Sequence, residues 1–119
     1  MEYIRRQIDD VLRKCATTFP VTLLTGPRQV GKSTTLEHVF ADVARATFDD
    51  PLLVDLAKRD PGLFLLNHPS PVILDEIQHA SALFPHLKMA CDRQRMNGLF
   101  FLTGSQPMHL MKHVTEPVS

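Results

Sequence analysis

The sequence contains no tryptophan, a single tyrosine and two cysteines, and it has no excess of charge of either sign. Cys15 and Cys91 lack the spacing of metal ligands, so they are predicted to be reduced core thiols of a cytoplasmic protein. The 13 basic and 13 acidic residues give a net charge of zero, and therefore no global field that would draw the chain to nucleic acid or to an anionic membrane. Small basic clusters are interpreted as solvated helix faces: Arg5-Arg6, Arg13-Lys14, and Arg93 with Arg95.

Long apolar runs are also missing. None approaches the ~20 residues needed to cross a bilayer. The opening "MEYIRRQIDD" is charged from its second residue, unlike a signal peptide. We therefore expect a cytoplasmic protein without a membrane segment. The 119 residues, of which 44% are hydrophobic, fit one globular domain over positions 1–119.

Helical and strand-like patterns alternate along the chain. Short apolar runs at 21–24, 72–74 and 99–102 are typical of strands buried on both faces of a parallel sheet, and "ARATF" at 44–48 is a weaker strand candidate. Strands separated by helices predict βαβ units, and hence an α/β fold with a mainly parallel sheet and helices on both faces. The first helix is amphipathic, with one apolar stripe: Ile4, Ile8, Val11, Leu12 and Cys15. Further helices are predicted from Ser33, at 51–59 and 61–67 after the N-caps Asp50 and Asp60, at 85–96 with Gly98 as a left-handed cap, and after Ser105.

The segment "LTGPRQVGKSTT", residues 24–35, follows the first predicted strand directly. Its spacing matches the pattern G-x-x-x-x-G-K-[ST] of a phosphate-binding loop, the Walker A motif. The glycines let successive backbone N–H groups converge on an anion, and the start of the following helix also favours phosphate. Lys32, expected to face solvent when no nucleotide is bound, supplies charge for the β- and γ-phosphates, and the Ser33 hydroxyl is placed to ligate Mg²⁺. The predicted nucleotide ligands are Gly26, Pro27, Arg28, Gln29, Val30, Gly31, Lys32, Ser33 and Thr34.

The stretch "VILDE" places Asp75 and Glu76 at the carboxyl end of a second buried strand, where ligands bind in open α/β folds. Asp75 can hold Mg²⁺ through water, opposite Ser33. Glu76 can activate the water that attacks the γ-phosphate. An acidic loop after a strand carries little weight alone, but together with a phosphate-binding loop it predicts a Walker B motif.

The stretch "FFLTGS" ends a further buried strand in hydroxyl groups and a glycine. Two roles for these hydroxyls stay open. Either Ser105 or Thr103 senses the γ-phosphate or positions the attacking water, or Ser105 caps the helix that follows. The two roles do not exclude each other.

These stretches together resemble one family. "FPVTLLTGPRQVGKSTTL", "ATFDDP", "PVILDEIQHA" and "FFLTGSQ" occur in the same order, over nearly the whole chain, as in bacterial and archaeal AAA-type ATPases that couple an N-terminal P-loop domain to a C-terminal domain of unknown function. The resemblance implies a doubly wound P-loop NTPase sheet, with the phosphate-loop strand beside the sensor strand and then the acidic-pair strand. It also implies ATP and Mg²⁺ as cofactors, with Ser33 and Asp75 at the metal, and with Glu76, Lys32 and Ser105 as catalytic residues.

The sequence departs from this family at its end. Family members continue near "MKHVTEPVS" into "L-A-G-R", a fifth strand and a second domain, whereas this sequence ends at Ser119. We therefore expect a truncated domain that lacks the last strand of the family, with the phosphate-loop strand at an edge that favours self-association. We also expect an arginine that completes the site to be missing. Arg28 is interpreted as an exposed loop residue, with contact to a neighbouring subunit's nucleotide as the alternative.

Two functions are consistent with these motifs. The first is the ATP-binding domain of an AAA-type ATPase that hydrolyses the β–γ phosphoanhydride of ATP with Mg²⁺, weakly in the isolated chain. The alternative is a nucleotide-dependent switch that binds ATP with little turnover and reports its occupancy to a partner. Intact Glu76 favours the enzyme, and the missing C-terminal region favours the switch. The expected partners are a nucleoside triphosphate, a second copy of the chain and an unidentified protein, while neither membrane nor nucleic acid is indicated.

Overall fold

The computed structural model describes residues 2–26 and 31–105, with side chains from residue 7 onward. Four predicted loop residues (Pro27, Arg28, Gln29 and Val30) and the helix predicted after Ser105 lie outside these ranges. The elements are, in chain order, α1 (Glu2–Thr18), β1 (Val21–Thr25), α2 (Lys32–Val39), β2 (Ala44–Thr47), α3 (Pro51–Arg59), α4 (Pro61–Asn67), β3 (Val72–Asp75), η2 (Ile77–Leu83), α5 (Phe84–Gln94) and β4 (Phe100–Gly104).

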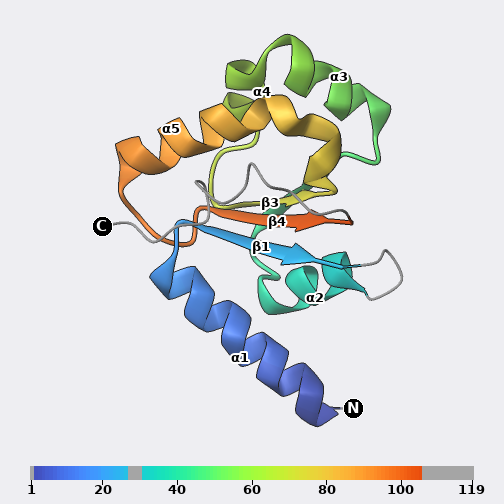
Figure 1. Ribbon diagram of the computed structural model, residues 1–119, viewed down its shortest axis with the longest axis vertical. Helices are drawn as coiled ribbons and strands as arrows, with labels where there is room; N and C mark the ends of the chain where they lie inside the picture. Colours follow the sequence, from blue (N-terminus) through green and yellow to red (C-terminus); the bar gives the residue numbers. More distant parts are fainter. Residues whose placement is uncertain (1, 27–30, 106–119) are drawn as a thin grey trace.

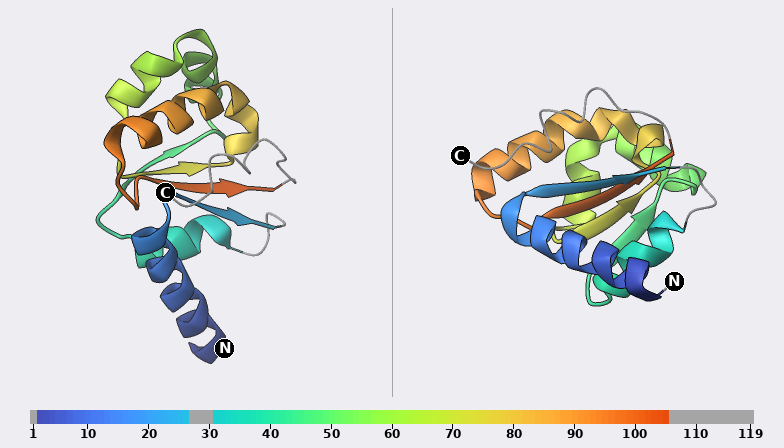
Figure 2. Two further views of the ribbon diagram at one scale, coloured as in Figure 1. Left: turned by 60° about the vertical axis from the view of Figure 1, so that its left-hand side comes forward. Right: turned by 60° about the horizontal axis from the view of Figure 1, so that its bottom comes forward.

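The strands of the described ranges form one parallel sheet in the order β1-β4-β3-β2 (Figure 1). Helices α1 and α2 cover one face of this sheet, and α3, α4, η2 and α5 cover the other, as the two further views in Figure 2 also show. The α/β class and the doubly wound parallel sheet are therefore confirmed. The predicted neighbours are confirmed as well, because β1, which precedes the phosphate-loop motif, lies beside β4, and β3 with its acidic pair follows.

Two Asp-Pro pairs start α3 and α4, as the sequence predicts. The Asp50 carboxylate accepts a hydrogen bond from the Leu52 N–H at 2.9 Å, and that of Asp60 accepts one from the Leu63 N–H at 3.0 Å. A proline follows each aspartate at the first position of its helix. These bonds satisfy N–H groups that a helix start leaves unpaired.

The segment after the acidic pair differs from the prediction. Residues Ile77–Leu83 form η2, a 3₁₀ segment that is kinked at Ala80 (φ −134°, ψ 48°) and runs into α5 at Phe84. The kink divides η2 into two short turns, and its buried residues are Ile77, Ala80 and Leu83.

The left-handed residue at the end of α5 is Arg95, with φ 51°, and not Gly98 as expected. Gly98 also has a positive φ of 70°, but it lies in the connection to β4. A Cβ atom at this position would lie 2.9 Å from the Ala16 carbonyl oxygen. Glycine is therefore required there by the close approach of α1, because a side chain would collide with its backbone.

Apolar residues pack on both faces of the sheet, which explains why the strands read as continuous apolar runs. The core under α3, α4, η2 and α5 includes Phe64, Leu74, Leu87 and Leu102. The core under α1 and α2 is smaller and is formed by Leu12, Leu36, Ile73 and Phe101. Phe40 extends the smaller core by stacking on Phe101, with 4.1 Å between the ring centroids.

Helix α1 buries fewer of its apolar side chains than the sequence predicts. Leu12 is buried, but Ile8 and Val11 are 41% and 59% exposed, so the apolar stripe is only in part a core face. Asp9 is buried beside α2, and its Oδ2 atom lies 3.6 Å from His38 Nε2.

Both cysteines are free thiols, in agreement with the prediction. Cys91 is buried and Cys15 is half-buried. Burial raises the pKa of the Cys91 thiol to about 11, with a further contribution from the Asp92 charge. Cys91 is therefore protonated and unreactive at neutral pH.

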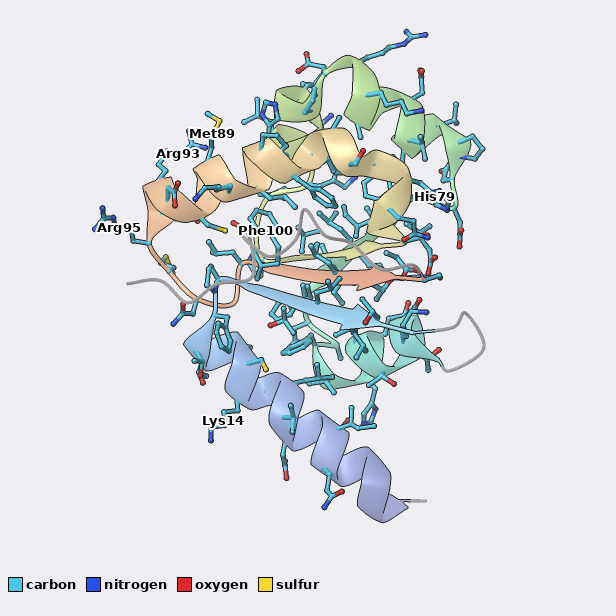
Figure 3. The ribbon with its side chains drawn as sticks, in the orientation of Figure 1. Lys14, His79, Met89, Arg93, Arg95 and Phe100 are labelled. Atoms are coloured by element: carbon cyan, nitrogen blue, oxygen red, sulfur yellow. The ribbon has the colours of Figure 1, made fainter. Side chains whose placement is uncertain are left out.

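Two of the predicted basic clusters, Arg13-Lys14 and Arg93 with Arg95, lie on exposed surfaces, as expected for solvated helix faces, whereas the side chains of Arg5-Arg6 lie outside the described part of the structure. Figure 3 shows Arg93 and Arg95 at the end of α5 that is remote from the carboxyl ends of the strands, and Lys14 on α1. Strand β1 lies at an edge of the sheet within the described ranges, also as expected. No helix in the part of the chain that the structure describes is long and apolar enough to cross a membrane.

Candidate functional site

Three strands bring the predicted site residues together at one edge of the sheet. Strands β1 and β4 end in register, with Thr25 opposite Gly104. The Gly26 N–H continues this pairing and donates to the Gly104 carbonyl oxygen at 3.3 Å. Strand β3 ends beside them at Asp75. The segments that follow the three strands therefore begin next to one another.

The described part of the phosphate loop is built on two glycines and a lysine. Gly26 and Gly31 have φ values of 150° and 72°, in the region that residues with a side chain rarely adopt. Helix α2 begins at Lys32, one residue earlier than predicted, with Gly31 as its N-cap. The N-terminus of α2 therefore lies at the carboxyl edge of the sheet, where its N–H groups and its dipole favour an anion.

Lys32 does not face solvent, and that expectation is wrong. Its residue exposure is 4%, and its Nζ donates to the Gly26 carbonyl oxygen at 2.6 Å. The long side chain reaches back across the loop, where a carbonyl oxygen offers a hydrogen bond that a desolvated ammonium group requires. The positive charge is thus already inside the loop.

Asp75 lies at the centre of a hydrogen-bond network. Its Oδ1 accepts from Ser33 Oγ at 2.7 Å and from Thr103 Oγ1, and its Oδ2 accepts from Arg45 Nη2 at 3.2 Å. Burial raises the pKa of Asp75, but the hydrogen bonds from Thr103, Ser33 and Arg45, together with the Arg45 charge, outweigh it, so the pKa lies below its ordinary value of 3.8. An ionised carboxylate therefore faces the first turn of α2 at neutral pH.

Glu76 follows in a left-handed conformation, with φ 55° and ψ 53°. Its Oε1 accepts from Ser105 Oγ at 2.7 Å and from Gln78 Nε2 at 2.8 Å, and within the described residues its Oε2 accepts no hydrogen bond. Burial raises the pKa of Glu76, but these hydrogen bonds and the Lys32 charge lower it to below its ordinary value of 4.5. Glu76 therefore offers an ionised oxygen that is available to a further donor.

The two candidate sensor hydroxyls contact the acidic pair. Thr103 Oγ1 donates to Asp75 and accepts from the Glu76 N–H at 2.9 Å, so it fixes the turn between the two acids. Ser105 Oγ holds the Glu76 carboxylate. The helix that Ser105 was predicted to cap lies outside the described ranges, so that alternative stays a prediction, as does contact with a γ-phosphate.

Replacing Thr103 by valine is expected to lower the free energy of unfolding by about 1–3 kcal/mol, because Asp75 and the Glu76 N–H would each lose a buried partner. Thr22 provides a matched control, since it is also buried in the sheet and its hydroxyl has no hydrogen-bond partner among the described residues. Thr22→Val should be neutral or stabilising. Urea denaturation of both variants is the measurement, and equal stability of the two would contradict this account of Thr103.

Sequence reasoning missed Arg45 and Gln78. Arg45 contacts Asp75, and its Nη1 lies 2.6 Å from Glu37 Oε1. A weak signal was present in "ARAT", because strand alternation places Arg45 on the face opposite buried Ala46, toward α2. Gln78 belongs to η2 and had no recognisable pattern.

The oxygens of Ser33 and Asp75 suit a magnesium ion, which prefers hard oxygen ligands. Ser33 Oγ and Asp75 Oδ1 are 2.7 Å apart at the N-terminus of α2. No group of three or more His, Cys, Asp or Glu residues that could hold a metal occurs in the described ranges. Magnesium bound with a nucleotide does not need such a group, because phosphates and waters complete its coordination.

Comparison with known proteins agrees with this arrangement. Residues 18–119 match the profile of a family described as an AAA domain. The chain is 35% identical, over 116 residues, to the uncharacterized proteins Mb2031c of Mycobacterium bovis and Rv2008c of Mycobacterium tuberculosis. The alignment covers 97% of this chain but 26% of each relative, so the chain spans about a quarter of their length.

Among solved structures, PCH-2 of C. elegans aligns with 93% of this chain and 38% of its own, at 17% identity and a TM-score of 0.46. The family match covers most of the chain. The matched residues include the described parts of the phosphate loop, strand β3 with the acidic pair and strand β4 with the hydroxyls. The chain therefore belongs to the AAA domain family and is a nucleotide-binding domain of the ATPase type.

Proposed function

We propose that residues 1–119 form an AAA-like P-loop domain that binds ATP with Mg²⁺ and hydrolyses its β–γ phosphoanhydride. One observation carries the proposal: the acidic pair, three hydroxyls and the loop lysine meet at the N-terminus of α2. The N-terminus of α2 favours an anion, and the two ionised carboxylates beside it favour a cation. The site therefore suits a metal ion together with a triphosphate better than it suits the metal ion or the triphosphate alone.

Binding of the triphosphate would rest on the phosphate loop and on the start of α2. The N–H groups from Gly31 to Thr34 would donate to phosphate oxygens. Lys32 would exchange the Gly26 carbonyl oxygen for the β- and γ-phosphates, with little movement because its ammonium group already lies in the loop. Pro27, Arg28, Gln29 and Val30 stay predicted ligands by their place in the motif.

Ser33 and Asp75 would hold the metal, Ser33 directly and Asp75 through water. When bound, Mg²⁺ would neutralise charge on the phosphates. The structural support is the hydrogen bond from Ser33 to Asp75, which keeps hydroxyl and carboxylate oxygens together.

Hydrolysis would use Glu76 as the group that orients and deprotonates the attacking water. Ser105 and Gln78 hold Oε1, which leaves Oε2 for that water. Ser105 would act as the sensor, because its hydroxyl donates to the Glu76 carboxylate and because Ser105 directly follows β4, the strand that pairs with β1. Charge that develops on the γ-phosphate usually needs a further cation from a neighbouring subunit or another segment.

The alternative proposal is a switch that binds ATP with little turnover. The lowered pKa of Glu76 gives it some support, since a carboxylate that is stabilised by its neighbours is a weaker base. Because the chain spans 26% of its curated relatives, the activity of a whole protein, its assembly with further copies, an unidentified protein partner and a cytoplasmic location are likewise proposals.

Titration of the 119-residue chain with fluorescent ATP and GTP analogues, with and without Mg²⁺, tests the proposal. We expect Mg²⁺-dependent binding, and phosphate release that is very slow and that rises with protein concentration as copies meet. Absence of binding at any Mg²⁺ concentration would refute the proposed function. Brisk release that is independent of concentration would show that one copy carries a complete site.

A further inference from the structure

Arg45 joins two elements of the site through its guanidinium group. Its Nη1 lies 2.6 Å from Glu37 Oε1 on α2, and its Nη2 lies 3.2 Å from Asp75 Oδ2 on β3. Arg45 itself belongs to β2, which pairs with β3. The guanidinium therefore bridges the helix that follows the phosphate loop and the strand that carries the acidic pair.

The two carboxylate oxygens of Asp75 have different neighbours. Oδ1 faces Ser33, the proposed metal ligand, while Oδ2 faces Arg45. The Asp75 side chain is 4% exposed, whereas those of Arg45 and Glu37 are 40% and 44% exposed. A cation near Oδ1 would therefore meet a carboxylate whose charge is already partly balanced from its other side.

We propose that Arg45 sets the Mg²⁺ affinity of Asp75 and keeps it low until a triphosphate adds its own negative charge. This inference rests on the proposed function. Glu37 reduces the influence of Arg45 on the Mg²⁺ affinity of Asp75, because the Glu37 carboxylate also pairs with the guanidinium group and partly neutralises its charge. Mg²⁺ then enters the site together with the nucleotide and does not occupy Asp75 beforehand.

The test replaces Arg45 by glutamine, which can still donate a hydrogen bond to Asp75 Oδ2 but carries no charge. The Mg²⁺ concentration for half-maximal binding of a fluorescent ATP analogue should fall about two- to fivefold, the scale of a partly exposed ion pair. Mg²⁺ alone should raise the melting temperature of R45Q more than that of the parent chain.

Glu37→Gln should act in the opposite direction and raise the half-maximal Mg²⁺ concentration about twofold. In the R45Q background the same change should have little further effect, because Glu37 acts through Arg45. A merely structural role of the bridge would weaken binding in both single variants. The opposite signs therefore distinguish a charge effect from a loss of structure.

Arg59→Gln is the matched control, since Arg59 pairs with Asp55 at 3.1 Å on the exposed face of α3 and its loss changes the net charge equally. Its half-maximal Mg²⁺ concentration should equal that of the parent. A half-maximal Mg²⁺ concentration for R45Q that is equal to or above that of R59Q would overturn the inference. If R45Q does not fold, E37Q decides: a half-maximal Mg²⁺ concentration that is unchanged or lower than that of the parent would also overturn it. Failure of the parent chain to bind ATP would instead refute the proposed function. The melting temperatures of R45Q and of the parent chain with Mg²⁺ alone would still decide the role of Arg45.

Discussion

Replacing Lys32 by alanine is expected to weaken binding of Mg·ATP by about 10- to 100-fold, because charge-assisted hydrogen bonds contribute about 1.5–3 kcal/mol. The Lys32 ammonium lies 2.6 Å from the Gly26 carbonyl oxygen, at the start of α2. It is therefore held where phosphate oxygens would enter the loop, and no other described residue of the loop supplies a positive charge. Isothermal titration calorimetry with ATP and excess Mg²⁺ measures the loss.

The control for this prediction is Lys88→Ala, which removes the same charge from an exposed pair with Asp92 on α5. Its affinity should match that of the parent chain. Because Lys32 is 4% exposed, its removal also changes buried contacts, so the melting temperature of each variant is measured alongside. Equal ATP affinity in a folded Lys32→Ala chain would contradict the assignment of the phosphate loop.

Replacing Glu76 by glutamine should leave ATP binding within about threefold of the parent while slowing hydrolysis by about 10²- to 10⁴-fold, the usual contribution of a general base. Glutamine keeps the shape of the side chain, and its amide oxygen can still accept from Ser105 and Gln78. It cannot take a proton from water. The measurement is single-turnover hydrolysis with the protein in excess over ATP.

The matched variant for this second prediction is Asp92→Asn, which changes an exposed acid into its amide on α5, away from the site. Its hydrolysis rate should be that of the parent. If the Glu76→Gln chain hydrolyses ATP as fast as the parent, Glu76 is not the base. The switch function would then be the better account of the acidic pair.

Most of the fold could be predicted because its signals are local. The Asp-Pro pairs fix the starts of α3 and α4, and apolar runs such as "VIL" identify strands that are buried on both faces. The η2 segment was missed because sequence reasoning looked for a sustained helical period, whereas η2 consists of short 3₁₀ turns that are interrupted by a non-helical backbone at Ala80.

The site could be predicted only where a motif fixes the residues. The grouping of Ser33, Asp75 and Glu76 at one sheet edge is confirmed, since parallel strands end at the same side. The burial of Lys32 depends on the path of its side chain across the loop. The contact of Arg45 with Asp75 depends on how β2 pairs with β3. Such tertiary information is not encoded in any short stretch of sequence.

The backbone of Glu76 has a consequence for protein engineering. A left-handed conformation costs a residue with a side chain about 1–2 kcal/mol, and at φ 55° Glu76 bears that cost. Glycine would relieve this backbone strain, but it would lose the hydrogen bonds that Ser105 and Gln78 donate to Glu76 Oε1. It would also remove the carboxylate on which the proposed hydrolysis depends. Position 76 is thus a point at which the backbone favours glycine, while the hydrogen bonds and the proposed turnover favour glutamate.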